Sequence, residues 1–211
     1  MNEPLTIAKT LSQILNHTAR VNPRLRASLR KGLSKTQIKE KTRTFPFRLP
    51  REVEELYQWR DGMELDAQND FLFHYHYFLP LHKALEERKM NINWRVLGDD
   101  DPTIVPELLP LFSCNGEFYG ARCRREKLDT APIYFVYHSE IQVYNSLTSM
   151  LSAILECYET GAYQPSTTEN GFATTIVDKQ LVAEIKLRWN PVRHEVYQDR
   201  LKRHDFYYCH P

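Results

Sequence analysis

Residues 108–123, LLPLFSCNGEFYGARC, decide the fold because they predict a β-hairpin in the middle of the chain. Two apolar stretches flank Asn115-Gly116, a pair that suits the two positive-φ positions of a type I′ turn. This turn sets the register and places Cys114 opposite Glu117. Cys123 then lies on the same face as Cys114 but too far along the ladder for the two sulfurs to bond.

Aromatic and β-branched stretches on both sides of the hairpin predict further strands. The segment FLFHYHYFLPL, Phe71 to Leu81, is expected as one strand. Ile133–His138 and Ile141–Tyr144 are expected as a second strand pair, which makes an antiparallel meander the natural arrangement. The two faces expected for the aromatic strand carry Phe71, Phe73, Tyr75 and Tyr77 on one side and Leu72, His74, His76 and Phe78 on the other.

Apolar residues at helical spacing dominate the two ends of the chain. Ser34 and Gln37 form a capping-box pattern that starts a helix near Lys35. A helix from Pro50 to about Arg60 begins with proline and is followed by a glycine. Further helices are expected around residues 7–15, 84–88, 147–158 and 181–189. This order indicates an α+β protein in which helices from the N- and C-terminal thirds pack on a twisted antiparallel sheet.

Bulk properties indicate a chain that folds on its own core. The 211 residues are 42% hydrophobic and 26% charged, which is typical of one globular domain. Glu3 and Lys9 interrupt the first apolar stretch, so no signal peptide is expected, and no apolar run is long enough for a membrane span. The four cysteines form no CxxC pair, which predicts reduced thiols and a cytoplasmic location.

The net charge of +1 conceals an uneven distribution. Residues 1–48 carry a net charge of +9, residues 49–178 carry −11 and residues 179–211 carry +3. The run from Arg20 to Arg43 holds nine basic residues against one acid, so nucleic-acid binding through the N-terminal helices stays open as an alternative. The run has no aromatic residue for base stacking and its cations spread round a helix, which argues against that alternative.

No residue pattern predicts catalysis, a cofactor or a metal site. The sequence contains neither a GxSxG elbow nor a glycine-rich phosphate-binding motif. His74, His76 and His82 lack the partner ligands that would complete a metal site. The run Asp99–Asp101 lacks the spacing of a calcium loop. A binding module is therefore favoured over an enzyme, and no small-molecule substrate is identified.

Several motifs, taken in order, resemble the SUKH superfamily, which groups Smi/Knr-type cell-wall assembly regulators with bacterial immunity-type proteins. The first motif is a Ser34-capped helix that leads to a helix opened by Leu49-Pro50 and followed by Asp61-Gly62. The later motifs are FLPLHKALEER, LLPLFSCNGEFYG and SLTSMLSAILECYETGAY. The resemblance covers most of residues 28–163.

The resemblance implies a single domain over residues 1–211, with a helical extension over 1–27, a core over 28–163, and a helix and tail over 164–211. It also implies a non-enzymatic adaptor that binds another protein, such as a cell-envelope or signalling protein. The alternative that it implies is an immunity protein that neutralises a toxin, for example a nuclease.

We expect the partner to bind a concave surface bordered by the end of the 50–60 helix and by the aromatic strand. Tyrosine and tryptophan are common anchors of protein interfaces, although a core role is expected for at least one of those present here. The candidate partner-binding residues are Tyr57, Trp59, Asp61, Gly62, Tyr75 and Tyr77.

Overall fold

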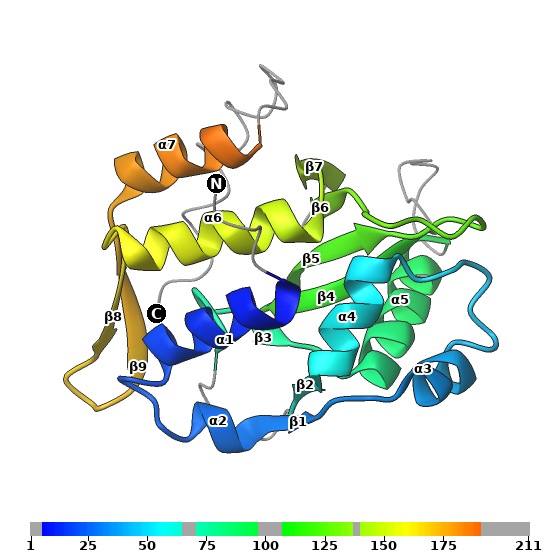
Figure 1. Ribbon diagram of the computed structural model, residues 1–211, viewed down its shortest axis with the longest axis horizontal. Coiled ribbons are helices and arrows are strands. Elements are labelled where there is room, and N and C mark those ends of the chain that lie inside the picture. Colours follow the sequence, from blue (N-terminus) through cyan, green and yellow to red (C-terminus); the bar gives the residue numbers. More distant parts are fainter. Residues whose placement is uncertain (1–5, 65–70, 97–106, 137–139, 191–211) are drawn as a thin grey trace.

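The computed structural model describes residues 6–64, 71–96, 107–136 and 140–190 (Figure 1). Its main sheet has five antiparallel strands in the order β3-β4-β5-β6-β7. The bounds are β3 Tyr77–Phe78, β4 Leu108–Cys114, β5 Glu117–Arg122, β6 Ile133–Val136 and β7 Glu140–Tyr144. The predicted α+β class and antiparallel meander are confirmed.

The central hairpin forms as its turn predicts. Asn115 and Gly116 have φ values of 44° and 91°, and Cys114 lies opposite Glu117 in the ladder. The described cysteines Cys114, Cys123 and Cys157 are all buried thiols, and none of them forms a disulfide. Cys209 lies outside the described residues.

Helices from both ends of the chain pack together with the sheet. Figure 1 shows α6 between α1 and α7, and α6 contacts both of them. One hydrophobic cluster joins the helices to the sheet, with Leu11, Val53 and Leu151 packed together with Phe112 and Ile133. None of the described helices is long and apolar enough to cross a membrane. The helix bounds are α1 Ile7–Thr18, α2 Leu25–Ser28, α3 Lys35–Lys41, α4 Arg51–Trp59, α5 Leu81–Val96, α6 Leu147–Glu159 and α7 Lys179–Trp189.

Local capping signals set where the helices begin. Ser34 accepts from the Gln37 backbone and donates its own N–H to the Gln37 side chain, so the predicted capping box of α3 is confirmed. Ser146 caps α6 through a similar reciprocal pair with Ser149. Pro50 is the N-cap residue of α4 rather than its first helical residue.

Two small antiparallel sheets were not predicted. In the first, β1 Leu29–Lys31 pairs with β2 Arg60–Met63, so the end of α4 continues directly into a strand. In the second, β8 Tyr163–Thr167 pairs with β9 Ala173–Val177 and forms a hairpin. This hairpin lies at the opposite end of the molecule from α3 (Figure 1).

The prediction of one strand over Phe71–Leu81 is wrong, because only Tyr77–Phe78 forms a strand there. His74 and Tyr75 have φ values of 32° and 62°, a left-handed conformation that reverses the chain. The residues before this turn therefore do not share strand faces with the residues after it. Aromatic composition favoured a strand, but the turn places these rings individually in the fold.

Candidate partner-binding pocket

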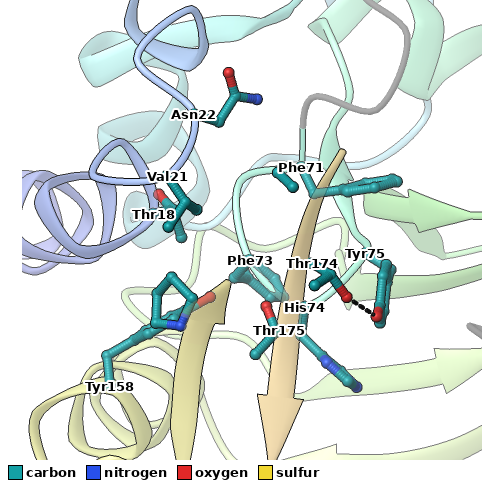
Figure 2. A pocket seen from close by; sticks show the side chains of 12 residues that line it. Thr18, Val21, Asn22, Phe71, Phe73, His74, Tyr75, Tyr158, Thr174 and Thr175 are labelled. Atoms are coloured by element: carbon teal, nitrogen blue, oxygen red, sulfur yellow. Dashed lines mark hydrogen bonds between the residues drawn. The ribbon is translucent and has the colours of Figure 1, made fainter. Parts of the chain in front are cut away.

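A shallow pocket lies between the end of α1, the turn at residues 71–75 and the β8–β9 hairpin (Figure 2). Its empty space is about 340 Å³, including the open mouth. The contributing segments are far apart in the sequence, so only the fold brings them together. Among the lining residues are Thr18 and Asn22 at the end of α1, Phe71 and Tyr75 in the turn, and Thr174 and Thr175 in β9.

The turn holds its shape through specific contacts. The hydroxyls of Tyr75 and Thr174 lie 2.7 Å apart and share a hydrogen bond, drawn as the dashed line in Figure 2. Nδ1 of His76 lies 2.8 Å from the His74 carbonyl oxygen. A non-glycine residue in the left-handed region costs about 1–3 kcal/mol, so these contacts have to offset a local penalty. Backbone strain of this kind is concentrated at binding and catalytic sites.

A chain of packed aromatic rings includes two lining residues of the pocket, His74 and Tyr158. The ring of Tyr163 lies 5.1 Å from that of His74 and 5.4 Å from that of Tyr158, which in turn stacks on His17 at 5.6 Å. Burial raises the pKa of both tyrosines, so their hydroxyls stay protonated at neutral pH. Burial, and then the charge of Arg20, lowers the pKa of His17 and favours the neutral imidazole.

The pocket therefore offers aromatic surface and neutral polar groups. None of the described residues that line it is an aspartate, glutamate, lysine or arginine. The hydroxyl of Thr175 and the amide of Asn22 supply polar groups, whereas the Thr18 hydroxyl already donates to the Ile14 carbonyl at 3.2 Å. Such a lining suits an apolar or aromatic side chain of a partner rather than a charged one.

Three of the predicted partner-binding residues lie in the core. Tyr57 is fully buried, and its ring lies 5.4 Å from that of Phe78. Its burial, together with the charge of Asp61, raises its pKa. The side chain of Asp61 is buried and accepts the N–H of Leu81 at 2.9 Å, at the start of α5.

The fold requires a glycine at position 62. Its φ is 74°, and a β-carbon at this position would lie 2.1 Å from the backbone nitrogen of Pro80. The Asp61-Gly62 pair therefore joins β2 to the segment Leu79–Leu81. Two motifs that stand apart in the sequence are in direct contact in the fold.

The other three predicted residues are partly accessible. The Trp59 indole N–H donates to the Ser12 hydroxyl of α1 at 3.3 Å, and Tyr77 lies opposite Ser113 at the edge of the main sheet. Of the six predicted residues, only Tyr75 lines the pocket. Of the accessible three, Tyr75 lies at the pocket, and Trp59 and Tyr77 lie at other partly exposed positions.

The β8–β9 residues of the pocket were missed by the sequence reasoning. The sequence does contain a hairpin pattern here, because Asn170-Gly171 separates two stretches rich in threonine. Gly171 has a φ of 78°, and the N–H of Thr168 bonds to the carbonyl of Phe172 across the turn.

The histidines considered as metal ligands lie in different surroundings. His74 stacks on Tyr163, whereas His76 is buried with Nε2 3.6 Å from a carboxylate oxygen of Glu117. Within the described ranges, no group of three His, Cys, Asp or Glu residues is arranged to hold a metal ion. The run Asp99–Asp101 lies outside those ranges.

The chain matches a known protein family. The sequence profile of the SMI1 / KNR4 family (SUKH-1) matches residues 32–153, more than half of the chain. The match includes the main sheet and the turn at residues 71–75, whereas α1 and the β8–β9 hairpin lie outside it. No curated protein matches the chain significantly.

Proposed function

Because the chain belongs to the SMI1 / KNR4 family (SUKH-1), we propose that it is a non-enzymatic protein-interaction module that holds a partner protein at the pocket of Figure 2. The observation that carries this proposal is the turn at His74 and Tyr75, where two non-glycine residues adopt left-handed φ values at the pocket. A conformation that costs free energy persists only when the surrounding fold enforces it, and such residues cluster at binding and catalytic sites.

Tyr75 is suited to be the anchor of the interface. Its ring is half-buried, and its hydroxyl is already fixed by Thr174. A side chain that is ordered before binding loses little conformational entropy in the complex. Tyrosine is also enriched among the residues that dominate binding energy.

The remaining predicted residues take two supporting roles in this proposal. Trp59 and Tyr77 are accessible enough to contact a partner that extends beyond the pocket. Tyr57, Asp61 and Gly62 are buried, so they hold α4, β2 and α5 in place rather than touch the partner. Because α1 and the hairpin lie outside the family match, the pocket walls that they form are the part that would select this chain's own partner.

Site-specific photo-crosslinking tests the proposal. A benzoylphenylalanine replaces Tyr75 in one variant and Lys35, an exposed residue of α3, in a control variant. Each variant is irradiated in the host cell after its fold is checked by circular dichroism. We expect a discrete protein adduct at Tyr75 that the Lys35 position does not give. Identical adduct patterns at the two positions would contradict the pocket as a binding site.

The affinity for the crosslinked protein then tests the anchor. Tyr75→Ala is expected to weaken binding by about thirtyfold, as loss of an interface hot spot does. The matched control is Met90→Ala, which truncates an exposed apolar residue of α5 and is expected to change the affinity by less than about twofold. Equal losses for the two variants would refute the assigned role of Tyr75.

A toxin partner would be a special case of the same proposal. The chain would then act as an immunity protein, and its co-expression with the toxin would restore growth. If a Tyr75→Ala variant at equal protein level still rescued growth fully, toxin neutralisation would not depend on the pocket. A cell-envelope or signalling partner would be recognised by the identity of the crosslinked protein.

A further inference from the structure

Two arginines face each other where the segment before α4 meets the segment after β5. Arg48 and Arg124 form an isolated antiparallel bridge, with the Arg48 N–H bonded to the Arg124 carbonyl at 2.7 Å. Opposed residues of an antiparallel pair project their side chains to the same side, with β-carbons about 4.5–5.5 Å apart. Both arginines are exposed, so two positively charged side chains leave the backbone on the same surface.

Carboxylates pair with the neighbouring cations. Arg51 lies 3.6 Å from both Glu55 and Asp129, and Lys127 pairs with Glu54. Within the described part of the chain, the side chains of Arg48 and Arg124 make neither an ion pair nor a hydrogen bond. Like charges placed directly opposite each other destabilise a strand pair, and among the described residues no carboxylate pairs with either arginine to relieve that cost.

We propose that Arg48 and Arg124 form a second protein-binding surface, which takes an acidic segment of a partner. Guanidinium groups bind carboxylates through paired, charge-assisted hydrogen bonds, and two adjacent forks can clamp successive acidic side chains. The exposed Arg125 extends the positive surface. The segment that joins α3 to α4 lies at the opposite end of the molecule from the β8–β9 hairpin (Figure 1). The surface is therefore separate from the pocket and gives an adaptor two points of attachment.

The surrounding charges favour an acidic protein segment over a nucleic acid. Glu54, Glu55 and Asp129 lie in the same region, and exposed Glu126 follows Arg125 directly. A phosphodiester strand carries a charge at every nucleotide and would meet these carboxylates on leaving the arginine pair. A protein segment can place acidic residues against the arginines and basic or neutral residues beyond them.

Fluorescence anisotropy with a labelled oligo-aspartate peptide tests this surface without knowledge of the partner. The unchanged chain is compared with a double variant, Arg48→Gln with Arg124→Gln, and with a control double variant, Lys35→Gln with Lys39→Gln. The control removes the same charge from exposed positions of α3. We expect at least about a tenfold loss of affinity for the arginine variant and less than about a twofold loss for the control.

Other outcomes would overturn the proposal. Equal losses in the two variants would mean that net charge alone attracts the peptide. Tighter binding of an oligothymidylate of equal charge, lost in the arginine variant, would make the surface a nucleic-acid site. The peptide carries no aromatic residue for the pocket, and the crosslinking at Tyr75 uses neither arginine, so failure of one proposal leaves the other standing.

Stability separates a binding role from a structural one. If the arginines serve binding and not stability, they repel each other in the free protein. Arg48→Gln then raises the urea midpoint of unfolding at low salt, and this gain shrinks as added salt screens the repulsion. A lower midpoint for Arg48→Gln would show that the arginines stabilise the fold, and the binding role would be withdrawn.

Discussion

The carboxylate of Glu52 in α4 accepts hydrogen bonds from both the backbone N–H and the hydroxyl of Thr148, 96 residues later in α6. The same carboxylate accepts the N–H groups of Leu147 and Ala131, each at 3.2 Å. Thr148 and Leu147 occupy the first turn of α6, whose N–H groups have no partner within the helix. One buried side chain thus fastens two helices and the segment before β6.

Replacement of Glu52 should therefore weaken the whole fold. Glu52→Gln keeps one acceptor oxygen but turns an amide donor toward other donors, and each buried group left unsatisfied costs about 1–3 kcal/mol. We expect a loss of about 3 kcal/mol in the free energy of unfolding, measured with urea. The control Glu55→Gln, on the exposed side of α4, should change stability by less than about 0.5 kcal/mol. Similar losses for both variants would argue against the buried anchor.

The close approach of Gly62 to Pro80 predicts a steric effect that a second glycine can calibrate. Gly62 and Gly171 both have positive φ, but a β-carbon at Gly171 would meet no atom within 4 Å. Gly171→Ala should cost about 1 kcal/mol from its backbone conformation alone. Gly62→Ala should cost about 3 kcal/mol or more, because the clashing atom belongs to the backbone. Equal costs in thermal unfolding would show that β2 and residues 79–80 are not in contact in solution.

The buried thiols should be almost inert in the native protein. Burial raises the pKa of Cys123 to about 12 and that of Cys157 to about 11, and the thiolate is the form that reacts. In a Cys209→Ser background, iodoacetamide at mildly alkaline pH should modify the native chain at least about a hundredfold more slowly than the chain unfolded in guanidinium. Rapid native labelling of Cys123 or Cys157, located by mass spectrometry, would contradict their burial.

His17 should contribute a pH dependence of stability with a definite sign. Its pKa in the folded chain lies below the ordinary value of 6.5, because burial and then Arg20 disfavour the charged ring. As pH falls below 6.5, the unfolded chain binds the proton more readily, so the folded state loses stability. The wild type should lose more stability than His17→Gln between about pH 7 and pH 5. A constant difference between the two proteins across this range would rule out the shifted pKa.

The sequence was sufficient where structure depends on neighbouring residues. Asn115-Gly116 supplied both the turn and the register of β4 and β5, and Ser34 marked the start of α3 because its partner is three residues away. The strand prediction for the aromatic segment failed because its conformation depends on residues that are distant in the sequence. Phenylalanine and tyrosine favour strands, but contacts of His74 and Tyr75 with β8, β9 and α6 hold the chain in a turn.

The candidate site was harder to predict than the fold. Its walls come from α1, the 71–75 turn and the β8–β9 hairpin, and no sequence spacing relates these segments. Aromatic residues near Asp61-Gly62 were plausible anchors by type, yet Tyr57 is in the core. Residue type alone does not separate an interface tyrosine from a buried one, and the three-dimensional contacts make that distinction.

The hydrogen bond between Tyr75 and Thr174 joins the strained turn to the hairpin, and a double-mutant cycle can measure that link. Tyr75→Phe and Thr174→Val each remove one hydroxyl and keep most of the side-chain shape. Each should destabilise the fold by about 1 kcal/mol, and the double variant by less than the sum, because the second change removes a bond already lost.

Hydrogen exchange shows where the Tyr75–Thr174 bond acts. Tyr75→Phe should increase exchange in β9 and leave β4 and β5 unchanged, since local contacts protect a peripheral hairpin more than global stability does. If the hairpin is one wall of the binding pocket, Tyr75→Phe should also weaken partner binding, although it keeps the aromatic ring at position 75. Additive stability losses, with no local change in exchange, would mean that the turn and the hairpin are held independently of this bond.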